Sequence, residues 1–102
     1  MNKLALMASV AATATILSQP VLADAVTDKY NKSCAVCHAT GAANAPKTHD
    51  VEAWAPRMEK GDEVLLQSVN NGLNAMPPKG MCFDCSDEEY ASMIEFMASP
   101  AK

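Results

Sequence analysis

Apolar residues recur along the chain at the spacing of helices, and the alternation typical of strands is absent. Val26 and Tyr30 lie one helical turn apart and predict a short helix over residues 24–33. Near the other end, spacings of three and four residues predict a helix whose buried face consists of Tyr90, Met93, Ile94 and Met97. We therefore expect an all-α fold of three to five short helices.

Two further helices are predicted in the middle of the chain by their end signals. The first covers residues 52–60 and requires Pro56 to lie in its first turn, where a proline is tolerated. The second covers residues 62–71, with Asp62 as its cap and Gly72 as its stop. These two helices lie between the two ends of the chain described above.

The last helix has a clear start signal. Ser86 and Glu89 have the spacing of a capping box, and the acidic residues between them suit the positive end of a helix. Residues 74–85, just before it, contain two adjacent prolines and a glycine, which exclude a regular helix. We expect this segment to be an irregular loop.

The first 23 residues follow a different pattern. A basic start at Lys3 precedes an apolar run over residues 4–17, and small residues end the segment at Ala23. This is the pattern of a secretory signal peptide, whereas a transmembrane anchor needs ~20 apolar residues. We predict that residues 1–23 are cleaved, which leaves a domain over 24–102 in the periplasm, with no membrane span in its mature form.

Composition limits what this domain can bury and what it can bind. The chain has one Trp, two Tyr and two Phe, so a short domain with this content needs a disulfide, a metal or a cofactor to complete its core. Its 12 acidic and 8 basic side chains give a net charge of −4. An acidic surface argues against nucleic acid and anionic membrane as partners and suits a basic patch on another protein.

One motif carries the chemistry. Cys34, Cys37 and His38 form C-x-x-C-H, the attachment signature of c-type haem. Each sulfur adds to one haem vinyl group, and the adjacent histidine becomes the proximal iron ligand. A thioredoxin-like site would need a βαβ pattern, and an exported chain disfavours a thiolate zinc site. The motif predicts one covalently attached haem c, which supplies the missing core.

The sixth iron ligand of an electron carrier is usually Met or His. The methionines in predicted helices are assigned to packing. Met76 lies in a loop stiffened by two prolines, which can present a thioether at little entropic cost. Met81 in the same loop is its rival, and His49 lies in a polar stretch that does not favour ligation. We predict iron ligation by His38 and Met76.

Together these motifs resemble those of class I c-type cytochromes, and more closely the bacterial cytochrome c5 group. The resemblance covers nearly all of residues 24–97. It rests on C-A-V-C-H at 34–38, G-A-A-N-A-P-K at 41–47, A-W-A-P-R at 53–57, N-A-M-P-P-K-G at 74–80 and C-F-D-C-S-D-E at 82–88. It implies a small class I cytochrome c fold, with short helices wrapped around one covalently bound haem.

The resemblance implies further roles around the haem. The carbonyl of Pro46 accepts the Nδ1–H of His38, although a plain turn residue is the alternative. Trp54 packs on the haem edge near the propionates, or serves as core, or both. Arg57 helps to neutralise a propionate, with a solvated side chain as the alternative.

The late cysteine pair, Cys82 and Cys85, is followed by Ser86 and not by His, so it is not a second haem site. The resemblance implies a disulfide that pins the loop of Met76 to the last helix. Closing such a small ring contributes about 2 kcal/mol. A redox-active dithiol is the alternative.

With both axial positions filled, we expect an electron carrier and not an enzyme. It would shuttle single electrons between redox proteins of a respiratory chain, through transient docking at an exposed haem edge, as a monomer or weak dimer. The alternative function is a haem-based gas sensor or small catalytic haem protein with a displaceable Met ligand.

Overall fold

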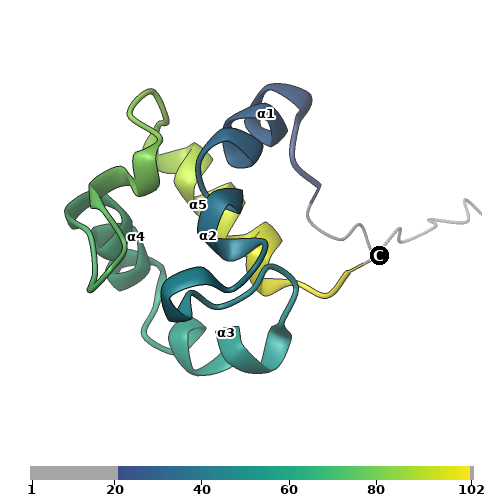
Figure 1. Cartoon of the computed structure of the whole chain (residues 1–102), viewed down its shortest axis with the longest axis vertical. Helices are drawn as coiled ribbons and strands as arrows, with labels where there is room; N and C mark the ends of the chain where they lie inside the picture. Colours follow the sequence, from purple (N-terminus) through teal and green to yellow (C-terminus); the bar gives the residue numbers. More distant parts are fainter. Residues whose placement is uncertain (1–20, 102) are drawn as a thin grey trace, which may run out of the picture.

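The structure is a computed structural model, and it describes residues 21–101. Figure 1 shows short helices joined by long loops, and no strand occurs among the described residues. The elements are α1 (Asp24–Lys32), α2 (Ala35–His38), the 3₁₀ turn η1 (Ala42–Asn44), α3 (Val51–Met58), α4 (Asp62–Asn71), the 3₁₀ turn η2 (Pro78–Met81) and α5 (Asp87–Ala98). The prediction of an all-α fold with few short helices is confirmed.

Helix α5 is the centre of the packing. It contacts α1, α3 and α4, and these helices surround it in Figure 1. Ser86 and Glu89 form the predicted capping box at its start. Its buried face consists of the four predicted residues, Tyr90, Met93, Ile94 and Met97, of which Met93 is the most deeply buried. Most of the protein core therefore lies along one side of this helix.

Helix α3 differs from its prediction in where it begins. The Asp50 side chain accepts a hydrogen bond from the backbone N–H of Ala53 at 3.3 Å, so the helix starts at Val51. Pro56 is then the sixth helical residue, and its predicted place in the first turn is wrong. The early cap sets the start of the helix, and Pro56 remains exposed within it.

Helix α4 has the predicted length but a different cap. Gly61, with φ of 94°, is the N-cap, and Asp62 is the first helical residue. The predicted cap by the Asp62 side chain is therefore wrong. Its carboxylate still lies in the first turn, where the helix dipole favours negative charge. Gly72 ends the helix with φ of 85°, as predicted.

The N-terminal prediction lies mostly outside the described residues, because the structure describes only Val21, Leu22 and Ala23 of the predicted signal peptide. Leu22 is buried and belongs to the core, whereas its two neighbours are exposed. Cleavage after Ala23 stays a prediction, and it would remove this core side chain. Among residues 21–101 no helix is long and apolar enough to cross a membrane.

Candidate functional site

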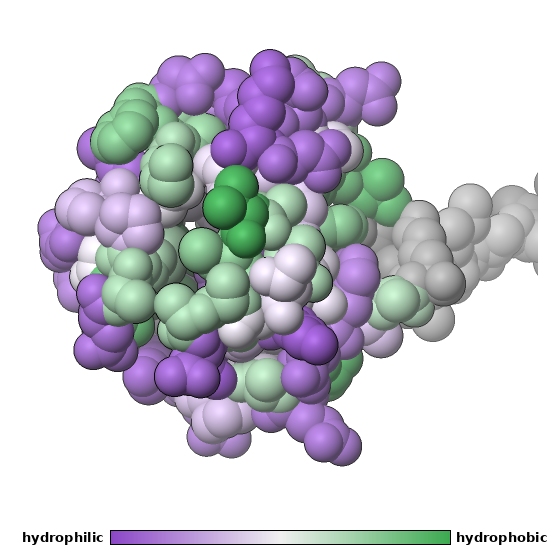
Figure 2. Space-filling view, in the orientation of Figure 1, coloured by the Kyte–Doolittle hydropathy of each residue, from purple (hydrophilic) through white to green (hydrophobic). Residues whose placement is uncertain are grey.

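A cavity of about 450 Å³ opens between α2 and the loop that leads into η2. In the space-filling view this face of the molecule is hollowed, and apolar residues border the hollow (Figure 2). The lining is mostly apolar and consists of Ser33, Cys34, Cys37, His38, Ala42, Ala43, Asn44, Ala45, Pro46, Arg57, Leu73, Asn74, Ala75, Met76, Pro77, Gly80 and Met81. The cavity thus brings together most of the predicted site residues.

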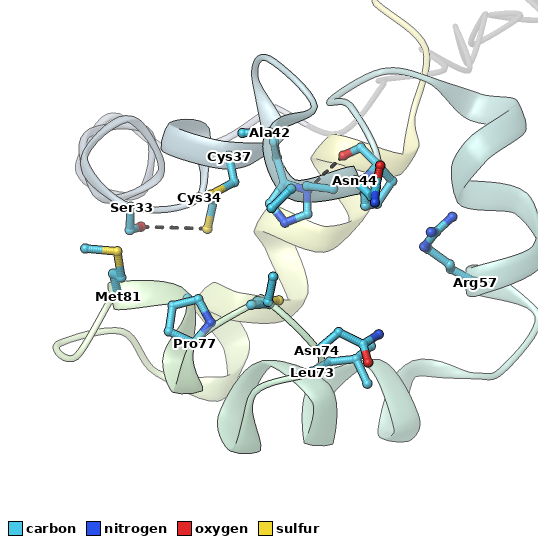
Figure 3. A pocket seen from close by; sticks show the side chains of 17 residues that line it. Ser33, Cys34, Cys37, Ala42, Asn44, Arg57, Leu73, Asn74, Pro77 and Met81 are labelled. Atoms are coloured by element: carbon cyan, nitrogen blue, oxygen red, sulfur yellow. Dashed lines mark hydrogen bonds between the residues drawn. The ribbon is translucent and has the colours of Figure 1, made fainter.

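The two thiols of the C-x-x-C-H motif lie on one wall, where Figure 3 shows them on the same segment. Both are free thiols and half-buried. Burial raises the pKa of the Cys34 thiol, although the Ser33 hydroxyl lies 3.7 Å from its sulfur and opposes that rise. A reactive dithiol of the thioredoxin kind has a lowered thiol pKa, so the environment of Cys34 argues against that alternative.

His38 is buried on the same wall and held in one orientation. Its Nδ1 lies 2.8 Å from the carbonyl oxygen of Pro46, which is the contact that the resemblance implies. A carbonyl only accepts hydrogen bonds, so Nδ1 carries the proton and Nε2 keeps its lone pair. The backbone N–H of Thr48 also donates to the His38 carbonyl at 2.8 Å. This ring is therefore prepared to bind a metal through Nε2.

Met76 also lines the cavity, in a tight loop whose labelled neighbours Asn74 and Pro77 lie across the cavity from Cys34 and Cys37 in Figure 3. The N–H of Leu73 donates to the Met76 carbonyl at 3.0 Å, and the N–H of Met76 donates to the Leu73 carbonyl at 2.9 Å. A side chain at Gly72 would place its Cβ 2.9 Å from the Met76 carbonyl oxygen, closer than real contacts allow. Gly72 is therefore needed both for its positive φ and for the close approach of this loop.

The two rival ligands are placed differently from Met76. Met81 lines the same cavity, but its side chain is 55% exposed, whereas Met76 is half-buried. His49 does not line the cavity. Its backbone N–H donates to Met97 at 2.7 Å and its Nδ1 lies 2.8 Å from the Ser99 carbonyl, so it holds the end of α5. These placements favour Met76 as the ligand opposite His38.

One end of the cavity is polar. Arg57 lies at this end, with Asn44 and Asn74 on the two walls beside it (Figure 3). The Arg57 guanidinium donates to the Ala53 carbonyl at 2.6 Å and makes no ion pair with any described carboxylate. Sequence reasoning missed the two asparagines. Their positive φ values, 65° for Asn44 and 53° for Asn74, suit a residue type that tolerates left-handed backbone, but no pattern in the sequence marks them as cavity residues.

Trp54 lies behind His38 and is not among the residues that line the cavity. Its ring centroid is 5.6 Å from that of His38, and its Nε1–H donates to the Lys47 carbonyl at 2.9 Å. The ring is buried, as expected of a core residue. A contact between Trp54 and a haem edge stays a prediction.

Cys82 and Cys85 form the disulfide that the resemblance implies. Cys82 is buried, and its carbonyl accepts a hydrogen bond from the Tyr90 hydroxyl at 2.5 Å. The bridge closes residues 82–85 just before α5, and the Tyr90 hydrogen bond connects this closed segment to the helix. The two sulfurs lie close to an Asp84 carboxylate oxygen, but bonded to each other they are not thiolate metal ligands.

The residues of the cavity fit a covalently attached haem. Two free thiols stand at the spacing that matches two vinyl groups, and the adjacent imidazole has one nitrogen prepared for iron. A thioether lies on the facing wall, and a cation with two amides lies at one end, where carboxylates can be paired. The mostly apolar lining and the volume suit a cofactor-sized ligand.

Comparisons with known proteins agree with this fit. The family model described as cytochrome c oxidase, cbb3-type, subunit III matches residues 22–97. Cytochrome c5 of Azotobacter vinelandii is 51% identical over 74 residues, which cover 70% of this chain and 88% of that protein. Cytochrome c5 of Ectopseudomonas mendocina is 42% identical over 73 residues, covering 70% and 84%.

Solved structures show the same fold. A mono-haem ferrocytochrome c from Shewanella putrefaciens is 52% identical, with a TM-score of 0.66 and coverage of 79% of this chain and 99% of that chain. A cytochrome c in an electron-transfer complex with nitrite reductase is 38% identical, with a TM-score of 0.66 and coverage of 76% and 95%. The chain therefore belongs to the cytochrome c5 group of class I c-type cytochromes, mono-haem electron-transfer proteins with one covalently attached haem c.

Proposed function

We propose that this cytochrome is a periplasmic carrier that shuttles single electrons between redox proteins of a respiratory chain, and that His38 and Met76 are the residues that would bind its haem iron. The observation that carries the proposal is the pair of facing walls of one cavity. His38 has its orientation fixed by Pro46, and Met76 is held in a tight loop opposite it. With both ligands in place no coordination position is left for a substrate, so the proposal is a carrier and not an enzyme.

The chain's residues have separate tasks in this function. Cys34 and Cys37 would hold the haem by two thioether bonds, so that it would not dissociate from the protein. The Pro46 carbonyl orients His38 and raises its basicity. The bound haem c supplies a one-electron couple whose potential is raised by Met/His ligation and burial. Arg57 is free of carboxylate partners among the described residues and would pair with a propionate at the polar end of the cavity.

Docking on other redox proteins is the remaining part of the proposal. The complex of a cytochrome c with nitrite reductase supports it, because that cytochrome shares this fold at 38% identity. The acidic surface suits partners with basic docking patches. Transient complexes of this kind need only a small interface, so we propose a monomer that pairs briefly with each partner.

The visible spectrum of the exported, haem-loaded protein tests this proposal. We expect a sharp low-spin reduced spectrum, a weak oxidised band from Met sulfur to iron, and no change on adding carbon monoxide. A high-spin spectrum, or one that shifts with carbon monoxide, would instead support a sensor or catalyst whose Met76 ligand is displaced. N-terminal sequencing of the same sample would test cleavage after Ala23.

A further inference from the structure

The end of η2 and the loop between η2 and α5 expose large apolar side chains to water. Phe83 is 74% exposed and Met81 is 55% exposed, and Phe83 is the most exposed of the large apolar residues in the described part of the chain. The segment between α4 and α5 projects from the body, green in Figure 1. Burying a phenylalanine side chain is worth about 1.5–3 kcal/mol. Because the Phe83 side chain is mostly exposed, it contributes little of this burial energy to the stability of the fold. It is available for contact with another protein.

Three contacts restrain the backbone of the same loop. The disulfide closes it, the Tyr90 hydroxyl donates to the Cys82 carbonyl at 2.5 Å, and the Lys29 ammonium donates to the Asp84 carbonyl at 2.8 Å. These three contacts fix the backbone on both sides of Phe83. A side chain on a fixed backbone loses less conformational entropy when it docks, so more of its burial energy appears as affinity.

Phe83 also lies near the mouth of the haem cavity. Met81 lines the cavity at the end where Figure 3 shows Ser33 and Cys34, far from Arg57. Two residues of chain span about 7 Å at most, so the Cα atoms of Met81 and Phe83 are no further apart than that. A partner that contacts Phe83 is therefore brought close to the thiol end of the cavity.

The charges around Phe83 define the partner. The Asp84 side chain is 82% exposed, with the Lys29 ammonium 4.0 Å from its carboxylate, and Asp87 and Glu88 are exposed in the first turn of α5, so carboxylates outnumber this one cation. An apolar side chain flanked by carboxylates fits a shallow apolar depression ringed by lysines and arginines. A second copy of this chain is disfavoured as the partner, because its own carboxylates would lie against the carboxylates around Phe83.

We propose that Phe83 is an anchor with which this cytochrome docks on its redox partners, and that the Cys82–Cys85 disulfide serves to hold this anchor in place. The proposal rests on the carrier function and adds to it the residue that selects the partner surface. Large aromatic side chains in the centre of an interface commonly carry most of its binding energy. The partner is a redox protein whose docking face offers an apolar depression with basic side chains around it.

A coated electrode can present this surface chemistry to the haem-loaded protein. The probe is a gold electrode with a mixed monolayer of methyl-terminated and ammonium-terminated alkanethiols, and the readout is the amount of electroactive protein at a fixed concentration. We expect Phe83→Ser to lower this amount about tenfold, the effect of losing ~1.4 kcal/mol of binding. Val51→Ser is the matched control, because Val51 is 44% exposed and does not line the cavity, and it should change the amount less than twofold.

Further arms separate the possible failures. A monolayer of ammonium groups alone should bind wild type and Phe83→Ser equally, and Cys82→Ser/Cys85→Ser should lose part of the binding to the mixed monolayer. Equal losses for Phe83→Ser and Val51→Ser would overturn the proposal. A wild-type dimer in sedimentation experiments that dissociates in Phe83→Ser would also overturn it. Failure of every variant and of wild type, each in its oxidised form, to accept electrons from soluble hexaammineruthenium(II) would instead count against the carrier function.

Discussion

The two walls of the haem cavity are built in different ways. His38 is buried, and both its ring and its carbonyl are tied to neighbouring residues next to the buried Trp54. Met76 is half-buried and is held by a short loop, by Gly72 behind it and by a disulfide beyond it. The position of His38 is fixed by packing in the core. The position of Met76 is fixed by backbone conformation and by a disulfide further along the chain. We therefore expect the methionine wall to open first under stress.

Removing the histidine ligand should have the largest effect, because it breaks the wall that belongs to the core. We expect His38→Ala to lower the yield of haem-loaded protein at least about tenfold, since ligand binding and folding are coupled. The measurement is haem absorbance per amount of exported chain. His49→Ala is the control, because His49 lies at the end of α5 and not on the cavity. A loaded His38→Ala protein in normal yield would contradict the assigned roles of the two walls.

Removing the methionine ligand should leave the fold but change the iron. For Met76→Ala we expect the weak Met-to-iron band to vanish, carbon monoxide to bind, and the reduction potential to fall on the order of 0.1 V. Met81→Ala should change none of these, although Met81 lines the same cavity. The reverse result would make Met81 the ligand, which would place the sixth ligand on an exposed side chain.

The glycines at the two ends of α4 offer a matched pair that tests the methionine wall. Gly72 and Gly61 both have positive φ, but a Cβ at Gly72 would meet the Met76 carbonyl oxygen at 2.9 Å, whereas a Cβ at Gly61 would meet nothing within 4 Å. Gly61→Ala should cost about 1–3 kcal/mol from backbone strain alone, because φ of 94° with ψ of 157° is a conformation essentially restricted to glycine. Gly72→Ala should cost about 2–4 kcal/mol, because a steric clash adds to that strain, and should weaken the Met-to-iron band. Chemical denaturation and the oxidised spectrum measure both effects.

The smallest effect concerns pH and the start of α5, near the disulfide. The backbone N–H of Ser86, and then the Lys29 ammonium, hold the pKa of Glu89 below its ordinary 4.5. Because the folded state favours the ionised carboxylate, this contribution is present at neutral pH and is lost as the pH falls through the lowered pKa. The stability difference between wild type and Glu89→Gln should therefore shrink on acidification.

Unfolding curves from neutral pH down to below 4.5 measure this difference. Glu88→Gln is the control, since Glu88 makes no hydrogen bond or ion pair in the described residues, and its difference should stay small throughout. A Glu89→Gln difference that does not change with pH would contradict the role assigned to the ionised carboxylate.

Much of this arrangement can be predicted from the sequence, for physical reasons. Periodic apolar residues determine which face of α5 is buried, and the capping box determines where it begins. The loop of Met76 could be identified because two prolines limit it. The sequence prediction places the start of α3 one residue late although its signal is local, since Asp50 is of a preferred N-cap type and its side chain accepts a hydrogen bond from the N–H of Ala53. Asn44 and Asn74 reach the cavity through irregular backbone, which leaves no periodic trace.

The mostly apolar lining of the haem cavity also has a consequence for the order of events in the life of the protein. Without the cofactor this mostly apolar lining would face water, at a cost of about 25 cal/mol for each Å² of apolar surface. Until the haem is attached, the chain therefore has little to gain from closing around this space. We expect attachment to precede folding, so that the cysteines are modified on an unfolded chain. Only chains that carry the haem would then reach the native packing.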